Sequence, residues 1–174
     1  MRLQNKQVGV LVEEGFEDLE FWVSVMRLRE EGAKVTFIGG GRAERFHGKH
    51  CLEARPDTTA DQVSADDFDA LVVPGGWAPD KLRRIPAVLE LVRTMDRQGK
   101  IIGAICHAGL VLISAGIVKG HRVTGSTGIK DDLVNAGAIW VDEAAFRDGN
   151  QVWGRVVEDI PAFCRELVNA ISET

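Results

Sequence analysis

Cys106 is the side chain in this sequence that could most directly act as a nucleophile. It follows the apolar segment 101–105 and precedes the apolar segment 110–113, a pattern that predicts a strand, a tight turn and a helix. Small neighbours flank it at Gly103, Ala104, Ala108 and Gly109. Such residues suit a nucleophile elbow, where backbone N–H groups at a helix N-terminus favour the thiolate. The alternative interpretation is a buried core cysteine with an inert thiol.

Three loops follow apolar segments that are typical of buried parallel strands. The loops are 13–18, 74–80 and 106–109. Because the carboxyl ends of neighbouring strands meet at one crevice of a doubly wound sheet, we expect these loops to form a single site.

The same loops carry groups that could assist a thiol in carbonyl or acyl chemistry. His107 is a candidate base, and the backbone N–H groups of Gly75, Gly76 and the residue after Cys106 could hold an oxyanion. Glu17 starts the first predicted helix. It is either an acid of the site or a solvated residue stabilised by the helix dipole.

Strands and helices alternate along most of the chain. Strands are predicted at 7–12, 34–38, 69–73 and 101–105, and helices at 16–31, 86–98 and 160–171. In the first helix Phe16, Leu19, Val23, Met26 and Leu28 recur at near-helical spacing, and Asp159 is the expected N-cap of the last. We therefore predict one α/β domain over residues 1–174, a three-layer, flavodoxin-like sandwich with a largely parallel sheet and helices on both faces.

The composition narrows the classes of function. At 174 residues and a net charge of −5 the chain suits one globular domain, and its scattered charges give no basic stripe for nucleic acid. No apolar run approaches the roughly 20 residues of a membrane-spanning helix, so we expect a cytoplasmic protein that binds no membrane. Three widely spaced cysteines favour neither a disulfide framework nor a zinc site.

Two short motifs that suggest cofactors have weak support. His47, His50 and Cys51 lie close together in a predicted hairpin, but no fourth ligand has suitable spacing. The glycines at 39–41 are followed by no helical pattern, which a phosphate-binding loop would need. We expect no metal and no cofactor.

Several linked motifs resemble the ThiJ/PfpI family of the class I glutamine amidotransferase-like superfamily, and most closely its PfpI-type, intracellular protease-like branch. The motifs are Glu14-Gly15-Phe16-Glu17-Asp18-Leu19-Glu20, Asp69-Ala70-Leu71-Val72-Val73-Pro74-Gly75-Gly76, Ala104-Ile105-Cys106-His107, Gly128-Ile129-Lys130-Asp131-Asp132 and Asn135-Ala136-Gly137. Together they extend over nearly the whole chain.

The resemblance implies roles for particular residues. Cys106 would be the nucleophile, His107 its catalytic partner, and Glu17 a carboxyl that hydrogen-bonds the sulfur. Asp80 matches an acidic residue that PfpI-like relatives supply across an oligomer interface, so the family implies a homodimer or hexamer. Ser126 stands where relatives often carry Tyr or His.

The family also implies the chemistry. We expect a cysteine-dependent, hydrolase-like enzyme that acts on a small carbonyl compound, a glycated group or a peptide. The alternative is a non-enzymatic stress protein in which Cys106 is a redox sensor. A glutaminase is disfavoured, because neither His107 nor His121 begins the late His-x-Glu motif of amidotransferases.

Overall fold

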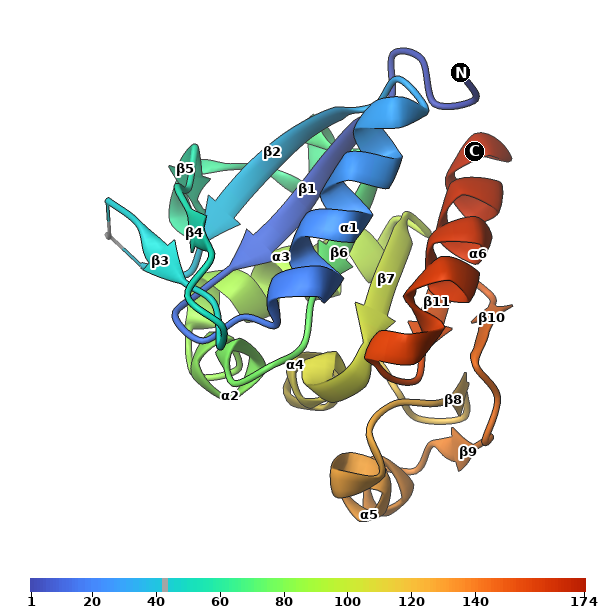
Figure 1. Ribbon diagram of the computed structural model, residues 1–174. Helices are drawn as coiled ribbons and strands as arrows, with labels where there is room; N and C mark the ends of the chain where they lie inside the picture. Colours follow the sequence, from blue (N-terminus) through green and yellow to red (C-terminus); the bar gives the residue numbers. More distant parts are fainter. Residues whose placement is uncertain (42–43) are drawn as a thin grey trace.

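The computed structural model describes residues 1–41 and 44–174, which are arranged around one seven-stranded sheet (Figure 1). The strands of the sheet are β1 (Gln7–Val12), β2 (Lys34–Gly39), β5 (Thr58–Thr59), β6 (Ala70–Val73), β7 (Ile101–Ile105), β10 (Ala145–Asp148) and β11 (Gln151–Gly154), in the order β10-β11-β7-β6-β1-β2-β5. Only the β10–β11 pair is antiparallel. The predicted largely parallel sheet is confirmed.

Helices cover both faces of the sheet. They are α1 (Asp18–Glu30), α2 (Ala78–Leu82), α3 (Pro86–Arg97), α4 (Gly109–Ala115), α5 (Lys130–Asn135) and α6 (Ile160–Ser172). Helices α1 and α6 pack together on one face, and α3 with α4 lies on the other (Figure 1). The predicted three-layer α/β class is therefore confirmed.

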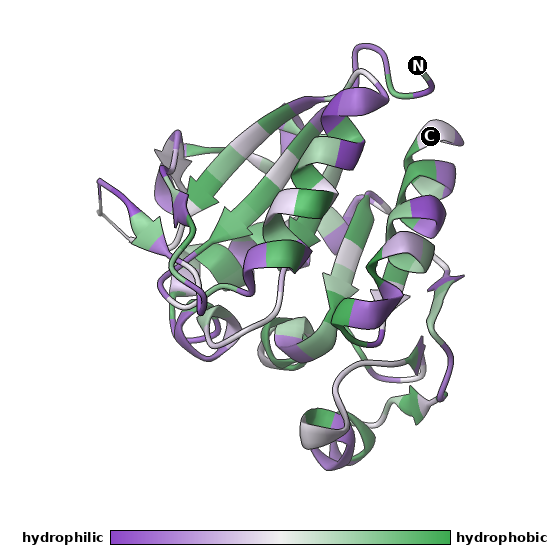
Figure 2. Cartoon of the chain, viewed as in Figure 1, coloured by the Kyte–Doolittle hydropathy of each residue, from purple (hydrophilic) through white to green (hydrophobic). Residues whose placement is uncertain are grey.

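The central strands form the core because every side chain of β6 and β7 is buried. Figure 2 shows these strands as largely hydrophobic, with hydrophilic residues concentrated on the helices and connections. Continuous apolar runs of this kind are typical of strands covered by helices on both faces. This is why the sequence predicts the strand positions well.

The apolar pattern of α1 does not mark one buried face. Phe21, Val25 and Leu28 are buried, whereas Leu19, Val23 and Met26 are exposed to 48%, 38% and 63%. The last three recur at helical spacing, so they form one stripe on the outer side of α1. The helix thus has an apolar side toward the sheet and a second, narrower one toward solvent.

The predicted cap of the last helix is also corrected. Asp159 stands at the N-cap of α6, but its side chain makes no capping hydrogen bond there. Its carboxylate instead accepts a hydrogen bond from Arg155 Nε at 2.9 Å. A charged guanidinium is a stronger partner than a backbone amide, which explains the preference.

Two small two-stranded sheets flank the main one. The predicted hairpin is formed by β3 (Phe46–His47) and β4 (Glu53–Ala54), and β8 (Arg122–Val123) pairs in parallel with β9 (Ile139–Trp140). None of the helices within 1–41 and 44–174 has the length and apolar character needed to span a bilayer.

The order of the strands creates a crevice at the carboxyl end of the sheet. From β1 the chain moves first to β2 on one side and then to β6 on the other, so the loops after β1 and β6 diverge there. Ligand sites of open α/β sheets lie at such switch points.

Candidate active site

Cys106 occupies the sharp turn between β7 and a helical turn at Cys106–Ala108 that leads into α4. Its φ angle is 61°, in the left-handed region that non-glycine residues rarely adopt. Its carbonyl oxygen accepts a hydrogen bond from Ser126 N at 3.1 Å, which holds the turn from the far side. The backbone strain of this strand-to-helix turn is therefore localised at Cys106.

Gly75 lies where the loop after β6 meets the elbow. A methyl group added there would come within 2.5 Å of Glu20 Oε2, 2.9 Å of Cys106 Cβ and 3.0 Å of His107 N. Only glycine lets the backbone approach this closely. The loop is also tied to the start of α1, since Glu17 N donates to Gly75 O at 3.1 Å.

The carboxyl that contacts the Cys106 thiol belongs to Glu20. Glu20 is fully buried, and its Oε2 accepts a hydrogen bond from Gly75 N at 2.7 Å. Its Oε1 is buried and makes no hydrogen bond within the described residues, while the carboxyl lies close enough to Cys106 to raise the pKa of the thiol.

The assignment of this role to Glu17 is corrected accordingly. Glu17 is the N-cap of α1, and its Oε2 accepts a hydrogen bond from Glu20 N at 2.8 Å. Because Glu20 lies one turn further along, its side chain turns inward to the thiol. Glu17 also lines the cavity, but its side-chain hydrogen bond caps the N-terminus of α1.

Glu20 and Cys106 hold their protons tightly. Burial, followed by the negative charge of Glu17, raises the pKa of Glu20 from 4.5 to about 8. Burial and the charge of Glu20 raise the pKa of Cys106 to about 12, against the lowering influence of the His107 and Gly76 backbone N–H groups. The expectation that the helix N-terminus would favour the thiolate is thus outweighed, because two adjacent buried groups resist a second negative charge.

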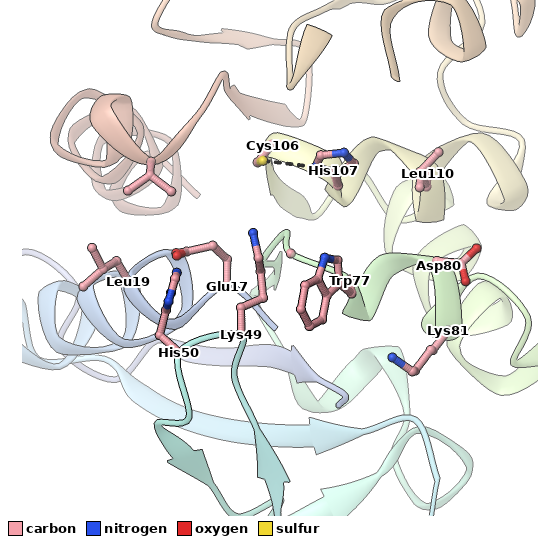
Figure 3. A pocket seen from close by; sticks show the side chains of 12 residues that line it. Glu17, Leu19, Lys49, His50, Trp77, Asp80, Lys81, Cys106, His107 and Leu110 are labelled. Carbon is pink, nitrogen blue, oxygen red and sulfur yellow. Dashed lines mark hydrogen bonds between the residues drawn. The ribbon is translucent and has the colours of Figure 1, made fainter. Parts of the chain in front are cut away.

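His107 is the base within reach of the thiol. Its Nδ1 lies 3.3 Å from Cys106 Sγ (Figure 3). Burial, and then the positive charge of Lys49, lower the pKa of His107 below 6.5. A neutral imidazole near pH 7 can accept a proton, so the structure brings these two predicted residues together in a useful protonation state.

The predicted oxyanion donors divide into two groups. The backbone N–H groups of Gly76 and His107 face the Cys106 sulfur closely enough to lower the pKa of the thiol. The N–H of Gly75 is already bound to Glu20 and is not free for substrate. The structure therefore offers two of the three expected donors.

Within this chain Asp80 lies further from the elbow, whereas Ser126 contacts it only through its backbone N–H, which donates to Cys106 O. Asp80 is in α2, half-exposed, and forms an ion pair with Arg84. Figure 3 shows its carboxylate beside Leu110, away from the Cys106–His107 pair. Ser126 Oγ accepts a hydrogen bond from Gly128 N at 3.3 Å and so caps a helical turn.

A cavity of about 660 Å³ opens above the thiol. Its lining includes Glu17, Lys49, His50, Trp77, Asp80, Lys81, Cys106 and His107 (Figure 3). In residues 1–41 and 44–174, no group of three or more His, Cys, Asp or Glu side chains is arranged to hold a metal ion.

Sequence reasoning missed Glu20 and Lys49. Glu20 belongs to the quoted motif around Glu17, and its position three residues after a helix N-cap could have marked it as the inward-facing acid. Lys49 gave no such signal, since it reaches the cavity only because the β3–β4 hairpin folds back over the start of α1.

The fold and site together define an α/β protein with a cysteine at the turn between a central strand and a helix. The profile of the DJ-1/PfpI family matches residues 6–170, so the chain belongs to that family. Deglycase PfpI of Pyrococcus furiosus is 42% identical over 156 residues, which are 90% of this chain and 93% of that protein. Protein/nucleic acid deglycase 2 of Escherichia coli is 34% identical over 169 residues, 96% of this chain and 98% of the other.

Solved structures show the same relationship. A two-domain protein of Anabaena variabilis contains DJ-1/ThiJ/PfpI-like and ferritin-like domains and superimposes with a TM-score of 0.93 at 37% identity. The match covers 95% of this chain and 48% of that one, so this chain spans about half of the two-domain protein. The family expected from the motifs is confirmed.

Proposed function

We propose that this protein is a cysteine-dependent enzyme that acts on electrophilic carbonyl groups, with deglycation or hydration of a reactive carbonyl compound as its reaction. The observation that carries the proposal is the cluster of Glu20, Cys106 and His107 at the elbow. The deglycase names of the two relatives support the same chemistry.

The first step follows from the geometry. Neutral His107 takes the thiol proton through Nδ1, and Cys106 Sγ forms a bond to the carbonyl carbon. The π electron pair moves to the carbonyl oxygen, where the Gly76 and His107 N–H groups stabilise it. His107 then returns the proton to that oxygen, which completes a hemithioacetal without any further reactant.

Glu20 keeps the site from accumulating negative charge. With a pKa of about 8 its carboxyl holds a proton near neutral pH and can donate it toward the sulfur. A carboxylate at this position would repel both the thiolate and the developing oxyanion. We therefore assign Glu20 the role of a buried proton donor to the nucleophile.

A peptide substrate requires more from the same site. Attack on a peptide bond would form a thioester and release an amine, and the leaving amine must take up a proton. Water would then hydrolyse the thioester and release the acid. His107 is the proton carrier available for both steps. Asp80 could orient His107 only from a neighbouring subunit, because within its own chain it pairs with Arg84.

A homo-oligomer would provide that neighbour. Leu19, Val23 and Met26 form an exposed stripe, of which Met26 lines a shallow hollow together with exposed Leu52 of the hairpin region and Leu19 lines the cavity above the thiol. Such apolar surface is typical of interfaces between subunits. We infer a homodimer or hexamer in which this surface is covered and Asp80 acts across an interface.

A substrate panel tests the proposed reaction. Methylglyoxal, glycated thiols and fluorogenic peptides are each incubated with the wild type and with Cys106→Ser. Turnover of the first two alone identifies a deglycase or glyoxalase, and turnover of peptides identifies a peptidase. If none is turned over while peroxide converts Cys106 to its sulfinate, the redox-sensor alternative is correct and the enzymatic proposal fails.

A further inference from the structure

Lys49 is placed over the elbow by a hairpin that is fastened to the start of α1. Lys49 N donates to Phe16 O at 2.9 Å. The buried Asp18 carboxylate accepts hydrogen bonds from His50 N and Leu52 N, both at 2.8 Å. These three hydrogen bonds, one at Lys49 and two at the residues that follow it, fix the backbone from which the Lys49 side chain enters the cavity.

The Lys49 ammonium has no oxygen partner in the described part of the chain. It lies 5.5 Å from the centre of the Trp77 ring, its only close contact there. Figure 3 shows the side chain rising from the hairpin toward Cys106 and His107, beside Trp77. Its charge reaches the reacting groups, because it contributes to the pKa of both His107 and Glu20.

The other charged groups of the cavity are engaged elsewhere. Lys81 Nζ donates to Glu14 O at 3.0 Å, and Asp80 pairs with Arg84. Glu17 accepts the backbone N–H of Glu20. Of the two lysines that line the cavity, Lys49 is therefore the one whose ammonium can bind a ligand.

We propose that Lys49 makes this site select carbonyl compounds that carry a carboxylate, by holding that carboxylate while the carbonyl carbon meets Cys106 Sγ. The inference deepens the proposed function and rests on it. One ammonium against an aromatic ring matches a single negative charge, whereas a phosphate dianion usually gathers several donors. Glycated amino acids and 2-oxo acids have the required combination of groups.

The rate of Cys106 alkylation tests the role of Lys49 without any turnover. Iodoacetate and iodoacetamide are close in size and differ in one negative charge, and the same thiolate attacks the CH2 carbon of each and displaces iodide. Any change in the fraction of Cys106 present as thiolate alters both rate constants by the same factor, so their ratio stays unchanged. Site-resolved mass spectrometry separates Cys106 from the other cysteines.

We expect Lys49→Met to lower the iodoacetate-to-iodoacetamide ratio about tenfold, the effect of losing one charge-assisted contact. Lys49→Arg should retain most of the ratio. Lys130→Met is the matched control, because Lys130 lies 5.8 Å over the Trp140 ring outside the cavity. An unchanged ratio in Lys49→Met, or an equal fall in Lys130→Met, would overturn the proposal.

A matched pair of substrates tests the same preference in turnover. The methylglyoxal adducts of N-acetylcysteine and N-acetylcysteamine differ in one carboxylate. Lys49→Met should lower kcat/KM for the first adduct about tenfold relative to the second. Equal losses for both adducts would contradict selection by Lys49. If neither adduct is turned over by the wild type, the proposed function fails, and the alkylation ratio still decides the role of Lys49.

Discussion

Glu20 and Cys106 face each other across Gly75, which donates its N–H to Glu20 Oε2 at 2.7 Å and has no room for a side chain. The carboxyl belongs to α1 and the thiol to the turn after β7, which are distant in sequence. Their proximity raises the pKa of the Cys106 thiol.

The raised pKa of Glu20 makes the stability of the protein depend on pH. The folded state retains a proton up to about pH 8 that the unfolded chain releases near 4.5. This contribution is complete below pH 4.5 and is lost as the pH rises to about 8, by roughly 4–5 kcal/mol at most. Glu20→Gln cannot titrate, so urea unfolding at pH 5 and pH 8 should show a smaller loss of stability in the variant.

The control for this comparison is the exposed residue Glu158. Glu158→Gln should follow the wild type at both pH values. Parallel stability curves for Glu20→Gln and the wild type would show that Glu20 does not hold an extra proton in the folded state.

The two glutamates at the start of α1 should affect the thiol differently. Removing the Glu20 charge removes a cause of the high pKa of Cys106, so Glu20→Gln should titrate below the wild-type value of about 12. Glu17→Gln should leave the thiol titration nearly unchanged. Thiolate absorbance against pH measures both, and a shift with Glu17→Gln alone would restore the original assignment.

Such corrections show where sequence reasoning ends. The strands could be predicted because they are apolar throughout, and the elbow could be predicted because Cys106 stands among small residues after β7. The choice between Glu17 and Glu20 depends on which way each side chain leaves the first turn of α1. The exposure of Met26 depends on what covers the outer face of α1, which helical spacing alone does not reveal.

A methyl group at position 75 should disturb both fold and site. Gly75→Ala would force its Cβ against Glu20 Oε2 and Cys106 Cβ, at a cost of about 1–3 kcal/mol for overpacking. Gly41→Ala meets no atom of the described residues within 4 Å and should change stability by less than about 0.5 kcal/mol. Chemical denaturation gives both values, and a Gly75→Ala protein as stable and active as Gly41→Ala would refute the tight packing at the elbow.

The outer stripe of α1 should control assembly. Met26→Glu places a charge in the proposed interface and should reduce the mass measured by light scattering to that of a smaller species. Val134→Glu, at a residue of α5 exposed to 46%, is the control and should keep the wild-type mass. If Met26→Glu retains the wild-type mass, this face is not the interface.

Mixed subunits test whether Asp80 acts across the interface. Asp80→Ala and Cys106→Ser should each be inactive alone. A mixed dimer restores one complete site, so co-refolded subunits should recover about a quarter of the wild-type activity. Full activity of Asp80→Ala alone would remove this residue from the mechanism.

The turnover of methylglyoxal by Cys106→Ser tests the central claim most directly. The variant keeps the size of the side chain and removes the thiol, so kcat/KM should fall by at least about a hundredfold. Cys51→Ser changes an exposed cysteine outside the elbow and should retain wild-type turnover. A folded Cys106→Ser protein with turnover equal to that of Cys51→Ser would show that Cys106 is not the nucleophile.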